Sequence, residues 1–293
     1  MSSFKSGFVA IVGPTNVGKS TLLNALIGDK VSIVSSRPQT TRQNIRGIKN
    51  LPNGQIVFVD TPGIHKPVHK LGEKMIKEAY DSFKTVDLAI LVVDCRKRTN
   101  SETKIISELK KTEVPTILVV NKVDSIKKPL LLPIIDNFSK LGFFKEIIPT
   151  SAIKREGLQE LLMVVLKYLP EGPKYFDDDI LTDQYERFMV AEIIREKVME
   201  NTRQEVPHSV AVDITSWQKR DDGLISIHAN ILVEKEGQKI IIIGKKGAML
   251  KKIGIEARIE IEHLLGDRVF LELWVKVRKA WREDEKLLQS LGY

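Results

Sequence analysis

One loop near the N-terminus constrains this chain more than any other feature. Gly13-Pro14-Thr15-Asn16-Val17-Gly18-Lys19-Ser20 has the spacing GxxxxGK[ST], between an apolar run at residues 8–12 and a helical pattern at residues 21–26. The glycines let backbone N–H groups and the helix N-terminus surround a phosphate, Lys19 reaches the β- and γ-phosphates, and Ser20 is placed to bind Mg²⁺. By itself the loop predicts only a nucleoside triphosphate.

The pattern around this loop predicts the fold of the first part of the chain. Val- and Ile-rich runs at residues 8–12, 55–60, 88–94, 116–121 and 147–150 alternate with polar stretches of helix length. Nearly continuous apolar runs are typical of strands covered on both faces, so we expect an α/β fold with a mostly parallel, doubly wound sheet. Pro170-Glu171-Gly172-Pro173 and Asp177-Asp178-Asp179 interrupt regular structure. We therefore predict a first domain at residues 1–170, a linker at 171–181 and a second domain at 182–293.

Two further segments add groups for Mg²⁺ and the γ-phosphate. Asp60-Thr61-Pro62-Gly63 ends a predicted strand, where Asp60 can hold Mg²⁺ through water and the Gly63 N–H can meet the γ-phosphate. A polar loop contains Pro38-Gln39-Thr40-Thr41-Arg42. This loop is either simply solvated, or one of its threonine hydroxyls binds the metal. We favour Thr41 over Thr40. The loop at residues 63–72, with His65 and Lys66, is expected to reorder when the γ-phosphate leaves.

Two motifs at the ends of later strands predict which base the nucleotide carries. In Asn121-Lys122-Val123-Asp124, the Asp124 carboxylate can accept hydrogen bonds from guanine N1–H and N2–H₂, a donor pair that adenine lacks. Thr150-Ser151-Ala152 can place a backbone N–H on the guanine oxygen. Lys19, Thr41 and Gly63 are the predicted catalytic residues, and Ser20, Thr41 and Asp60 the predicted metal ligands. The predicted nucleotide-binding residues are Gly13, Pro14, Thr15, Asn16, Val17, Gly18, Lys19, Ser20, Thr21, Asp60, Thr61, Pro62, Gly63, Asn121, Lys122, Asp124, Ser151 and Ala152.

The second domain carries a different signal. A helical stretch at residues 183–201 precedes a hairpin pattern at 209–217 and 224–234, a helix at 248–265 and a strand at 268–277. Gly244-Lys245-Lys246-Gly247 opens the 248–265 helix and resembles the GXXG loop of a KH domain. The chain has a net charge of +8, and residues 235–258 hold seven basic and two acidic residues. We predict binding of single-stranded nucleic acid, RNA rather than DNA, by Gly244, Lys245, Lys246, Gly247, Lys251, Lys252 and Arg258.

Taken together, these motifs resemble the Era family of translation-factor-related GTPases. The resemblance rests on Asn16, Pro38-Gln39-Thr40-Thr41-Arg42, Asp60-Thr61-Pro62-Gly63-Ile64-His65, Asn121-Lys122-Val123-Asp124 and Ser151-Ala152, and it covers essentially the whole chain. It implies a P-loop GTPase domain followed by an α+β type II KH domain, with a short helix at residues 236–243 where propensity favours a strand. It also implies GTP and GDP as ligands, and binding to the 3′ end of 16S ribosomal RNA during assembly of the small (30S) subunit.

The same resemblance suggests how hydrolysis proceeds. Ile64 follows Gly63, where Ras-like GTPases have a glutamine that orients water, so we expect slow intrinsic hydrolysis. Asn16 resembles the asparagine that binds K⁺ in related GTPases, so K⁺ is a further expected cofactor.

Composition excludes several classes of protein and leaves others open. No uncharged apolar run approaches the roughly 18 residues of a membrane-spanning helix, and the single cysteine, Cys95, is typical of a reducing compartment. We expect a cytoplasmic protein, with peripheral contact to the inner membrane. Trp217, Trp274 and Trp281 are expected in the core or an interface rather than stacked on bases. The alternative functions are a membrane-associated signalling switch, whose KH-like domain binds protein, and a tRNA-modifying enzyme, for which no cofactor site is visible.

Overall fold

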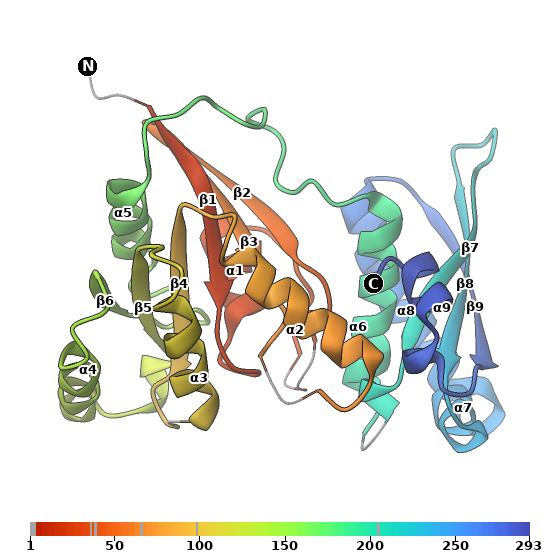
Figure 1. The fold of residues 1–293 in the computed structure, drawn as a ribbon. Helices are drawn as coiled ribbons and strands as arrows, with labels where there is room; N and C mark the ends of the chain where they lie inside the picture. The colour runs from red at the N-terminus through yellow and green to blue at the C-terminus, as the bar shows by residue number, and fades with distance from the viewer. Residues whose placement is uncertain (1–3, 36, 38–39, 65–66, 98, 204–205) are drawn as a thin grey trace. The chain divides into compact units, whose positions relative to one another are not determined.

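The computed structural model describes residues 4–35, 37, 40–64, 67–97, 99–203 and 206–293. The chain divides into two compact units (Figure 1). The first unit comprises Met1–Val34, Thr41–Pro67 and Gly72–Asp183. The second comprises Gln184–Tyr293 with the short segments Ser35–Thr40 and Val68–Leu71.

A six-stranded sheet forms the centre of the first unit. Its strand order is β2-β3-β1-β4-β5-β6, and every neighbouring pair is parallel except β2 and β3. The prediction of a mostly parallel, doubly wound sheet is confirmed. The strands are β1 (Lys5–Val12), β2 (Ile45–Leu51), β3 (Gly54–Asp60), β4 (Leu88–Asp94), β5 (Thr116–Asn121) and β6 (Glu146–Pro149).

Helices cover both faces of this sheet, which explains the nearly continuous apolar runs of its strands. One face packs against α1 and α5, where Gly47 of β2 leaves room for Leu23 and Gly54 of β3 for Leu166. The other face forms a core with apolar residues of α2, α3 and α4, including Ala79, Ile105 and Phe138. The helices are α1 (Lys19–Ile27), α2 (Lys70–Ser82), α3 (Asn100–Leu109), α4 (Leu131–Ser139) and α5 (Leu158–Tyr168).

Strand β2 is absent from the sequence prediction, which treated residues between the first helix and residue 55 as a loop. The strand pairs antiparallel with β3, from Ile45 opposite Asp60 to Leu51 opposite Gly54. Arg46, Lys49 and Asn50 interrupt its apolar residues, so it lacks the apolar run of the central strands. The dipeptide Asn53-Gly54 is a turn signal that could have revealed the hairpin.

Residues 171–181, the expected linker, lie along the first sheet. The Gln55 side chain accepts hydrogen bonds from the backbone N–H groups of Tyr175 (2.8 Å) and Phe176 (3.0 Å). The Ile48 N–H donates to the Leu181 carbonyl at 2.8 Å. This segment is therefore ordered by the Gln55 side chain and by backbone groups of the sheet, and the division between the units falls after Asp183.

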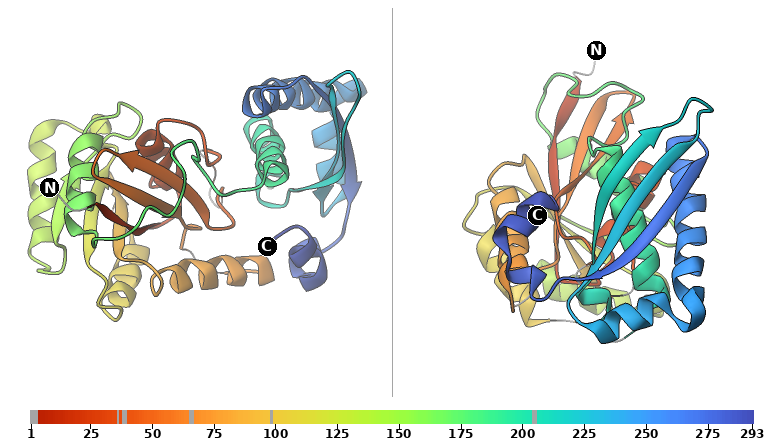
Figure 2. Two further views of the ribbon diagram at one scale, coloured as in Figure 1. Left: turned by 90° about the horizontal axis from the view of Figure 1, so that it is seen from above. Right: turned by 90° about the vertical axis from the view of Figure 1, so that its right-hand side faces the viewer.

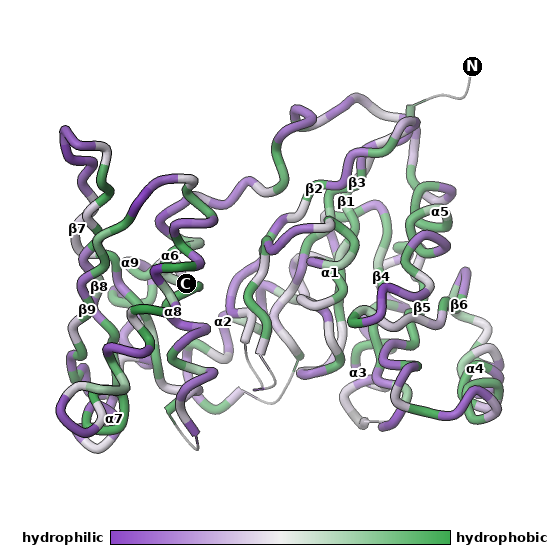
Figure 3. Tube along the Cα trace, turned by 180° about the vertical axis from the view of Figure 1, so that it is seen from behind, coloured by the Kyte–Doolittle hydropathy of each residue, from purple (hydrophilic) through white to green (hydrophobic). Residues whose placement is uncertain are grey.

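The second unit is a three-stranded sheet covered on one face by helices (Figure 2). Strands β7 and β8 are antiparallel, β8 and β9 are parallel, and α6 and α8 pack together with the sheet in one apolar core. Figure 3 shows that the turn between β7 and β8 is hydrophilic. The elements are α6 (Glu186–Asn201), β7 (Ala211–Lys219), β8 (Ile225–Val233), α7 (Glu236–Ile243), α8 (Ala248–Leu265), β9 (Val269–Val277) and α9 (Glu285–Ser290).

This order confirms the predicted α-β-β-α-α-β arrangement and the short helix at residues 236–243. The prediction for the tryptophans is correct for Trp281, which is fully buried and donates its indole N–H to the Ser209 carbonyl at 2.8 Å. Trp274 does not lie in the core, because its side chain is 58% exposed. Trp274 alternates with the core residue Val275 on β9, so its side chain lies on the opposite face of the sheet from the core.

Candidate functional site

The phosphate loop joins the end of β1 to the start of α1, and its path requires glycine. Gly18 has a φ of 97°, and a Cβ there would lie 2.5 Å from Asn121 Nδ2. A Cβ at Gly13 would collide with the Val92 carbonyl. Asn16 also has a positive φ, 63°, which an asparagine tolerates better than most residues. Larger side chains at the two glycines would therefore displace β4 or β5.

Lys19 begins α1 and lies folded into this loop. Its Nζ donates hydrogen bonds to the carbonyls of Gly13 (3.2 Å) and Pro14 (2.9 Å). Burial lowers the pKa of Lys19 to about 8, and the nearby Asp60 carboxylate offsets only part of this effect. Phosphate oxygens beside the ammonium group would raise this pKa again, so the site is suited to an anionic ligand.

Three side-chain oxygens converge close to Lys19. The hydroxyls of Ser20 and Thr41 donate to Asp60 Oδ2 at 2.7 and 3.2 Å, and the two hydroxyl oxygens lie 2.8 Å apart. Ser32, which the sequence reasoning missed, also donates to Asp60 Oδ2, at 3.2 Å. Thr40 takes no part in this cluster, because its hydroxyl donates to the Arg37 carbonyl at 2.8 Å. The favoured threonine, Thr41, is thus the one whose hydroxyl reaches Asp60.

This oxygen cluster fits Mg²⁺, a hard cation that prefers hydroxyl, carboxylate and water oxygens. Asp60 is fully buried, and its Oδ1 has no hydrogen-bond partner within the described residues. Burial raises the pKa of Asp60, although Lys19 and the three hydroxyls offset part of the rise. A divalent cation would stabilise the ionised carboxylate and supply the missing partner.

The segment after β3 packs against the phosphate loop. A Cβ at Gly63 would lie 2.6 Å from Thr15 Cγ2, so the two loops approach at backbone distance. Thr61 donates its hydroxyl to the Ile11 carbonyl at 2.9 Å, and Pro62 is buried beside it. Ile64 is 5% exposed and belongs to the core that includes α2 and α3. Its side chain is therefore occupied by packing.

The predicted base-binding motifs meet at the ends of β5 and β6. Asn121 accepts hydrogen bonds from the Thr150 hydroxyl and the Ala152 N–H, both at 3.2 Å, and donates to the Val17 carbonyl at 3.0 Å. Ser151 donates to Asp124 Oδ1 at 2.6 Å, and Asp124 is exposed. Asn121 thus connects the phosphate loop to the base-binding segments, while the Asp124 carboxylate remains accessible to a ligand.

Asp94, at the end of β4, supports this arrangement and was not predicted. It accepts two hydrogen bonds from the Arg96 guanidinium, at 2.9 and 2.6 Å, and pairs with Lys122 at 2.9 Å. Burial raises the pKa of Asp94, but the hydrogen bonds from Arg96 and Lys122 outweigh it and hold the pKa well below its usual range. Lys122 also donates to the Asn16 carbonyl, so Asp94 positions the lysine that spans the phosphate loop.

Some predicted positions are not part of the described chain. Pro38 and Gln39 of the threonine-containing loop, and His65 and Lys66 of the second loop, lie outside the described residues.

The GXXG loop of the second unit is a single 3₁₀ turn, Lys245–Gly247, between α7 and α8. Gly244, Lys246 and Gly247 all have positive φ, and a Cβ at Gly244 would lie 2.6 Å from Met249 Cβ. Lys245 and Lys246 are exposed. The loop therefore presents two ammonium groups on a backbone that a ligand can approach closely.

A groove of about 430 Å³ begins at this loop and runs between α8 and β9. Among the predicted RNA-binding residues, Gly247, Lys251 and Arg258 line it. Lys252 does not line it and lies 3.7 Å from Glu256. Ile255 and Phe270, both 45% exposed, form apolar walls that the sequence reasoning missed. An apolar groove with basic edges can accept unstacked bases and their phosphates.

The fold and the two sites define a P-loop nucleotide-binding protein of the GTPase class with a KH domain. The family model described as 50S ribosome-binding GTPase matches residues 8–122, and the KH domain model matches residues 205–282. GTPase Era of Ruminiclostridium cellulolyticum is 52% identical over 292 residues, covering 99% of this chain and 98% of that protein. GTPase Era of Geotalea daltonii is 53% identical over 291 residues, with the same coverage. The chain belongs to the Era GTPase family.

Two solved structures are similar to this chain over the same length. A crystal structure of a variant of Aquifex aeolicus Era bound to GDP·AlF₄⁻ has a TM-score of 0.96 and 45% identity, covering 99% of both chains. A crystal structure of Era in complex with MgGDPNP and nucleotides 1506–1542 of 16S ribosomal RNA has the same TM-score and coverage and 44% identity. In the part of the chain that the structure describes, no helix is long and apolar enough to span a membrane.

Proposed function

We propose that this GTPase hydrolyses GTP in the first unit and couples its nucleotide state to RNA bound by the second. The convergence of Ser20, Thr41 and Asp60 oxygens beside Lys19 carries the proposal for hydrolysis. In this proposal residues 1–170 form the GTPase domain, residues 182–293 form the RNA-binding domain, and residues 171–181 connect them.

The guanine base is recognised by groups at the ends of β5 and β6. Asp124 accepts hydrogen bonds from guanine N1–H and N2–H₂. The Ala152 N–H, which donates to Asn121 Oδ1 in this structure, turns to the guanine oxygen when the nucleotide binds. Asn121 holds the segment at Thr150–Ala152 beside the phosphate loop through its bonds to the Thr150 hydroxyl and the Val17 carbonyl. The full proposed nucleotide set is Gly13, Pro14, Thr15, Asn16, Val17, Gly18, Lys19, Ser20, Thr21, Asp60, Thr61, Pro62, Gly63, Asn121, Lys122, Asp124, Ser151 and Ala152.

The reacting phosphates lie against Lys19 and the Gly63 N–H. Ser20 and Thr41 would ligate Mg²⁺ directly and Asp60 through water. When bound, Mg²⁺ neutralises charge on the β- and γ-phosphates. Lys19 stabilises the oxygens that gain negative charge, and the Gly63 N–H orients the γ-phosphate. Because Ile64 is buried, its side chain does not orient the attacking water, and we assign that role to backbone groups. Asn16 is the residue that would hold K⁺, which when bound would supply further positive charge at the site. Hydrolysis should accordingly be slow, and faster in K⁺ than in Na⁺; equal single-turnover rates in the two salts would remove K⁺ from the proposal.

The second unit is proposed to bind the 3′ end of 16S ribosomal RNA and to assist assembly of the 30S subunit. The basic loop Lys245–Gly247 and the groove between α8 and β9 support single-stranded RNA as the ligand. The related Era structure containing 16S ribosomal RNA supports the choice of RNA. We further propose a cytoplasmic location with peripheral contact to the inner membrane.

The test is RNA binding measured with protein bound to a GTP analogue, bound to GDP, or free of nucleotide. Oligonucleotides from the 16S 3′ end are compared with a scrambled sequence at several salt concentrations. We expect sequence-selective binding that is tightest with the GTP analogue. Weak binding that is independent of both sequence and nucleotide would contradict the proposal.

Two double variants provide a matched comparison. Lys245→Gln with Lys246→Gln removes two phosphate contacts and should reduce the slope of log K against log salt by roughly 1.4. Lys110→Gln with Lys111→Gln makes the same change at another adjacent lysine pair, at the end of α3, and should leave the slope unchanged. Equal effects of the two would show that general charge, and not the GXXG loop, binds the RNA.

A further inference from the structure

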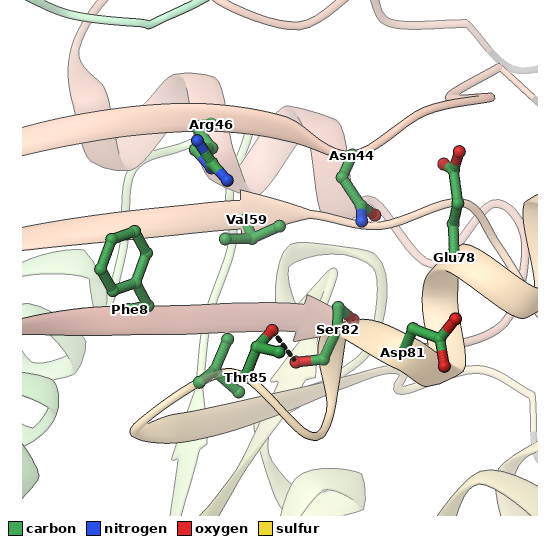
Figure 4. Close-up of a pocket in the computed structure, with 9 residues that line it drawn as sticks. Phe8, Asn44, Arg46, Val59, Glu78, Asp81, Ser82 and Thr85 are labelled. Atoms are coloured by element: carbon green, nitrogen blue, oxygen red, sulfur yellow. Dashed lines mark hydrogen bonds between the residues drawn. The ribbon is translucent and has the colours of Figure 1, made fainter.

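The charged groups around one cavity of the first unit are largely compensated within the chain. This cavity has a volume of about 380 Å³ and lies between the sheet and the second half of α2. Figure 4 shows Arg46 on the β2 side and Glu78 projecting from α2. Arg46 pairs with Asp183 at 2.6 Å. Burial raises the pKa of Glu78, and a hydrogen bond from the Asn44 N–H and the charge of Lys74 offset part of the rise. The cavity therefore has little charge left to select an ionic ligand.

The start of α4 carries exposed apolar side chains that neither the nucleotide site nor the RNA groove uses. Leu130 is 56% exposed and Leu132 is 71% exposed, and Pro129 and Pro133 beside them are also exposed. Single exposed apolar residues are common on protein surfaces, whereas contiguous ones mark a contact with a partner. These four residues lie close together, where a 3₁₀ turn (Lys128–Leu130) leads into the helix.

Two lysines adjoin this apolar group. Lys127 and Lys128 are exposed, and neither forms an ion pair within the described residues. The sequence has no acidic residue between Asp124 and Asp136, and Asp136 is paired with Lys140 at 2.6 Å. Residues 127–133, which we call the α4 tip, therefore combine an apolar surface with two uncompensated positive charges.

The opposite side of α4 holds the tip in place. Phe138 is 2% exposed in the core, and Leu131 and Ile134 pack against the same core. Figure 1 shows α4 at the end of the first sheet where β6 lies. The tip is therefore a preformed surface, because its leucines are exposed without any change in the packing of the helix.

The backbone of the α4 tip suits an apolar environment better than it suits a phosphate of RNA. A helix start attracts phosphate through unpaired N–H groups. Pro129 and Pro133 have no N–H, and the N–H of Leu130 donates to the Lys127 carbonyl at 2.9 Å. The N–H of Leu131 is likewise bonded within the 3₁₀ turn. Contact with lipid therefore leaves none of these positions with an unsatisfied donor. A second copy of the tip would bring lysines against lysines, whereas anionic lipid headgroups complement them.

We propose that the α4 tip is the surface with which this protein contacts a membrane of anionic lipids. Leu130 and Leu132 enter the boundary between headgroups and acyl chains, while Lys127 and Lys128 lie at the level of the lipid phosphates. The contact with the inner membrane rests on the proposed function, whereas the surface itself depends on neither nucleotide nor RNA. Two leucines and two lysines give weak, reversible binding rather than a permanent anchor.

The first experiment tests the apolar part of the α4 tip by sedimentation of the full chain with vesicles of phosphatidylcholine mixed with phosphatidylglycerol. Because the chain has a net charge of +8, any anionic surface attracts it, so the variants decide the question. Leu130→Ser with Leu132→Ser should weaken vesicle binding roughly tenfold. Ile240→Ser with Ile241→Ser changes a matched pair of exposed residues on α7 and should leave binding unchanged. No binding of the parent, or equal losses in the two variants, would overturn the proposal.

The second experiment tests the lysines with the same vesicles. Lys127→Gln with Lys128→Gln should weaken binding roughly twentyfold, since each lysine near an anionic surface contributes to the attraction. Lys110→Gln with Lys111→Gln removes the same charge at the end of α3 and should have a much smaller effect. Equal losses in the two variants would show that general charge, and not the α4 tip, holds the protein at the surface.

The third experiment separates lipid from RNA as the partner of the α4 tip. Affinities for the GTP analogue and for 16S 3′-end oligonucleotides are measured on the parent and on the double leucine variant, and we expect both to be unchanged by the substitutions. Loss of RNA affinity in this variant would assign the tip to RNA and overturn the proposal. A parent that binds vesicles through the tip but binds neither nucleotide nor RNA would contradict the proposed function and support the surface. Intact nucleotide and RNA binding without vesicle binding would contradict the surface alone.

Discussion

Two serines donate to the same carboxylate oxygen, and replacing each by alanine separates metal binding from structural support. Ser20→Ala and Ser32→Ala each remove one hydroxyl that donates to Asp60 Oδ2, at 2.7 and 3.2 Å respectively. Only the Ser20 oxygen also lies 2.8 Å from the Thr41 hydroxyl, at the centre of the proposed Mg²⁺ site. The two substitutions are chemically identical, so any difference between them reports the position of the oxygen.

Both variants should lose similar stability when nucleotide is absent. A hydrogen bond to a charged acceptor contributes about 1.5–3 kcal/mol, and Asp60 retains two of its three hydroxyl donors in either variant. We expect each variant to lose about 2 kcal/mol of unfolding free energy, with Ser32→Ala at least as costly because Ser32 is the more deeply buried. Their affinities for a GTP analogue in Mg²⁺ should differ: Ser20→Ala loses a direct metal ligand and should bind at least tenfold more weakly, while Ser32→Ala stays within about threefold of the parent.

Urea unfolding of nucleotide-free protein measures the first quantity, and titration of a fluorescent GTP analogue in Mg²⁺ and in EDTA measures the second. In EDTA the two variants should bind alike. The reasoning is refuted if Ser32→Ala loses Mg²⁺-dependent affinity as fully as Ser20→Ala does, or if Ser20→Ala retains it.

Three other substitutions test separate parts of the site. Asp124→Asn keeps the oxygen that accepts from Ser151 but loses the charge that accepts two guanine donors, so GTP affinity should fall roughly a hundredfold, about 3 kcal/mol, and XTP affinity should rise in competition titrations. Asp94→Asn should lower stability by about 2 kcal/mol at pH 7. Because the pKa of Asp94 in the folded protein is below its usual 3.8, the stabilising contribution is present above that value and is lost as pH falls toward the folded pKa, so parent and variant should converge in urea unfolding below about pH 3.8. Ile64→Gln buries an amide in an apolar core and should cost about 2 kcal/mol in urea unfolding without accelerating single-turnover GTP hydrolysis; faster hydrolysis would contradict the buried orientation of this side chain.

The sequence was sufficient for those parts of the site that depend on consecutive residues. A glycine with positive φ and a lysine at a helix start are local requirements, so Gly18 and Lys19 could be recognised from spacing alone. The GXXG loop at Gly244–Gly247 could also be recognised from its spacing, but the helix before it, α7, followed only from the resemblance to type II KH domains, because four isoleucines favour a strand. There the packing of the whole domain determines a helix, although the isoleucines by themselves favour a strand.

Contacts between distant segments could not be read from the sequence. Ser32 and Asp94 follow no motif, and each becomes part of the site only because the sheet order places its segment beside Asp60 or Lys122. Strand β2 was missed for a related reason. Its charged and polar positions are acceptable on an edge strand that pairs on one side only, whereas the prediction was based on the apolar runs of central strands.

The position after Gly63 shows how packing limits the chemistry available to this site. Ile64 is 5% exposed among residues of β1, β4, α2 and α3, while its backbone N–H donates to the Gly13 carbonyl at 3.3 Å. The side chain therefore holds the second loop against the core, and the backbone ties that loop to the phosphate loop. A glutamine that reached a water molecule would have to leave this core and give up the packing that keeps Gly63 beside Thr15. In this chain residue 64 cannot both hold the two loops together and orient water, which is why the proposed function assigns the water to backbone groups and not to this side chain.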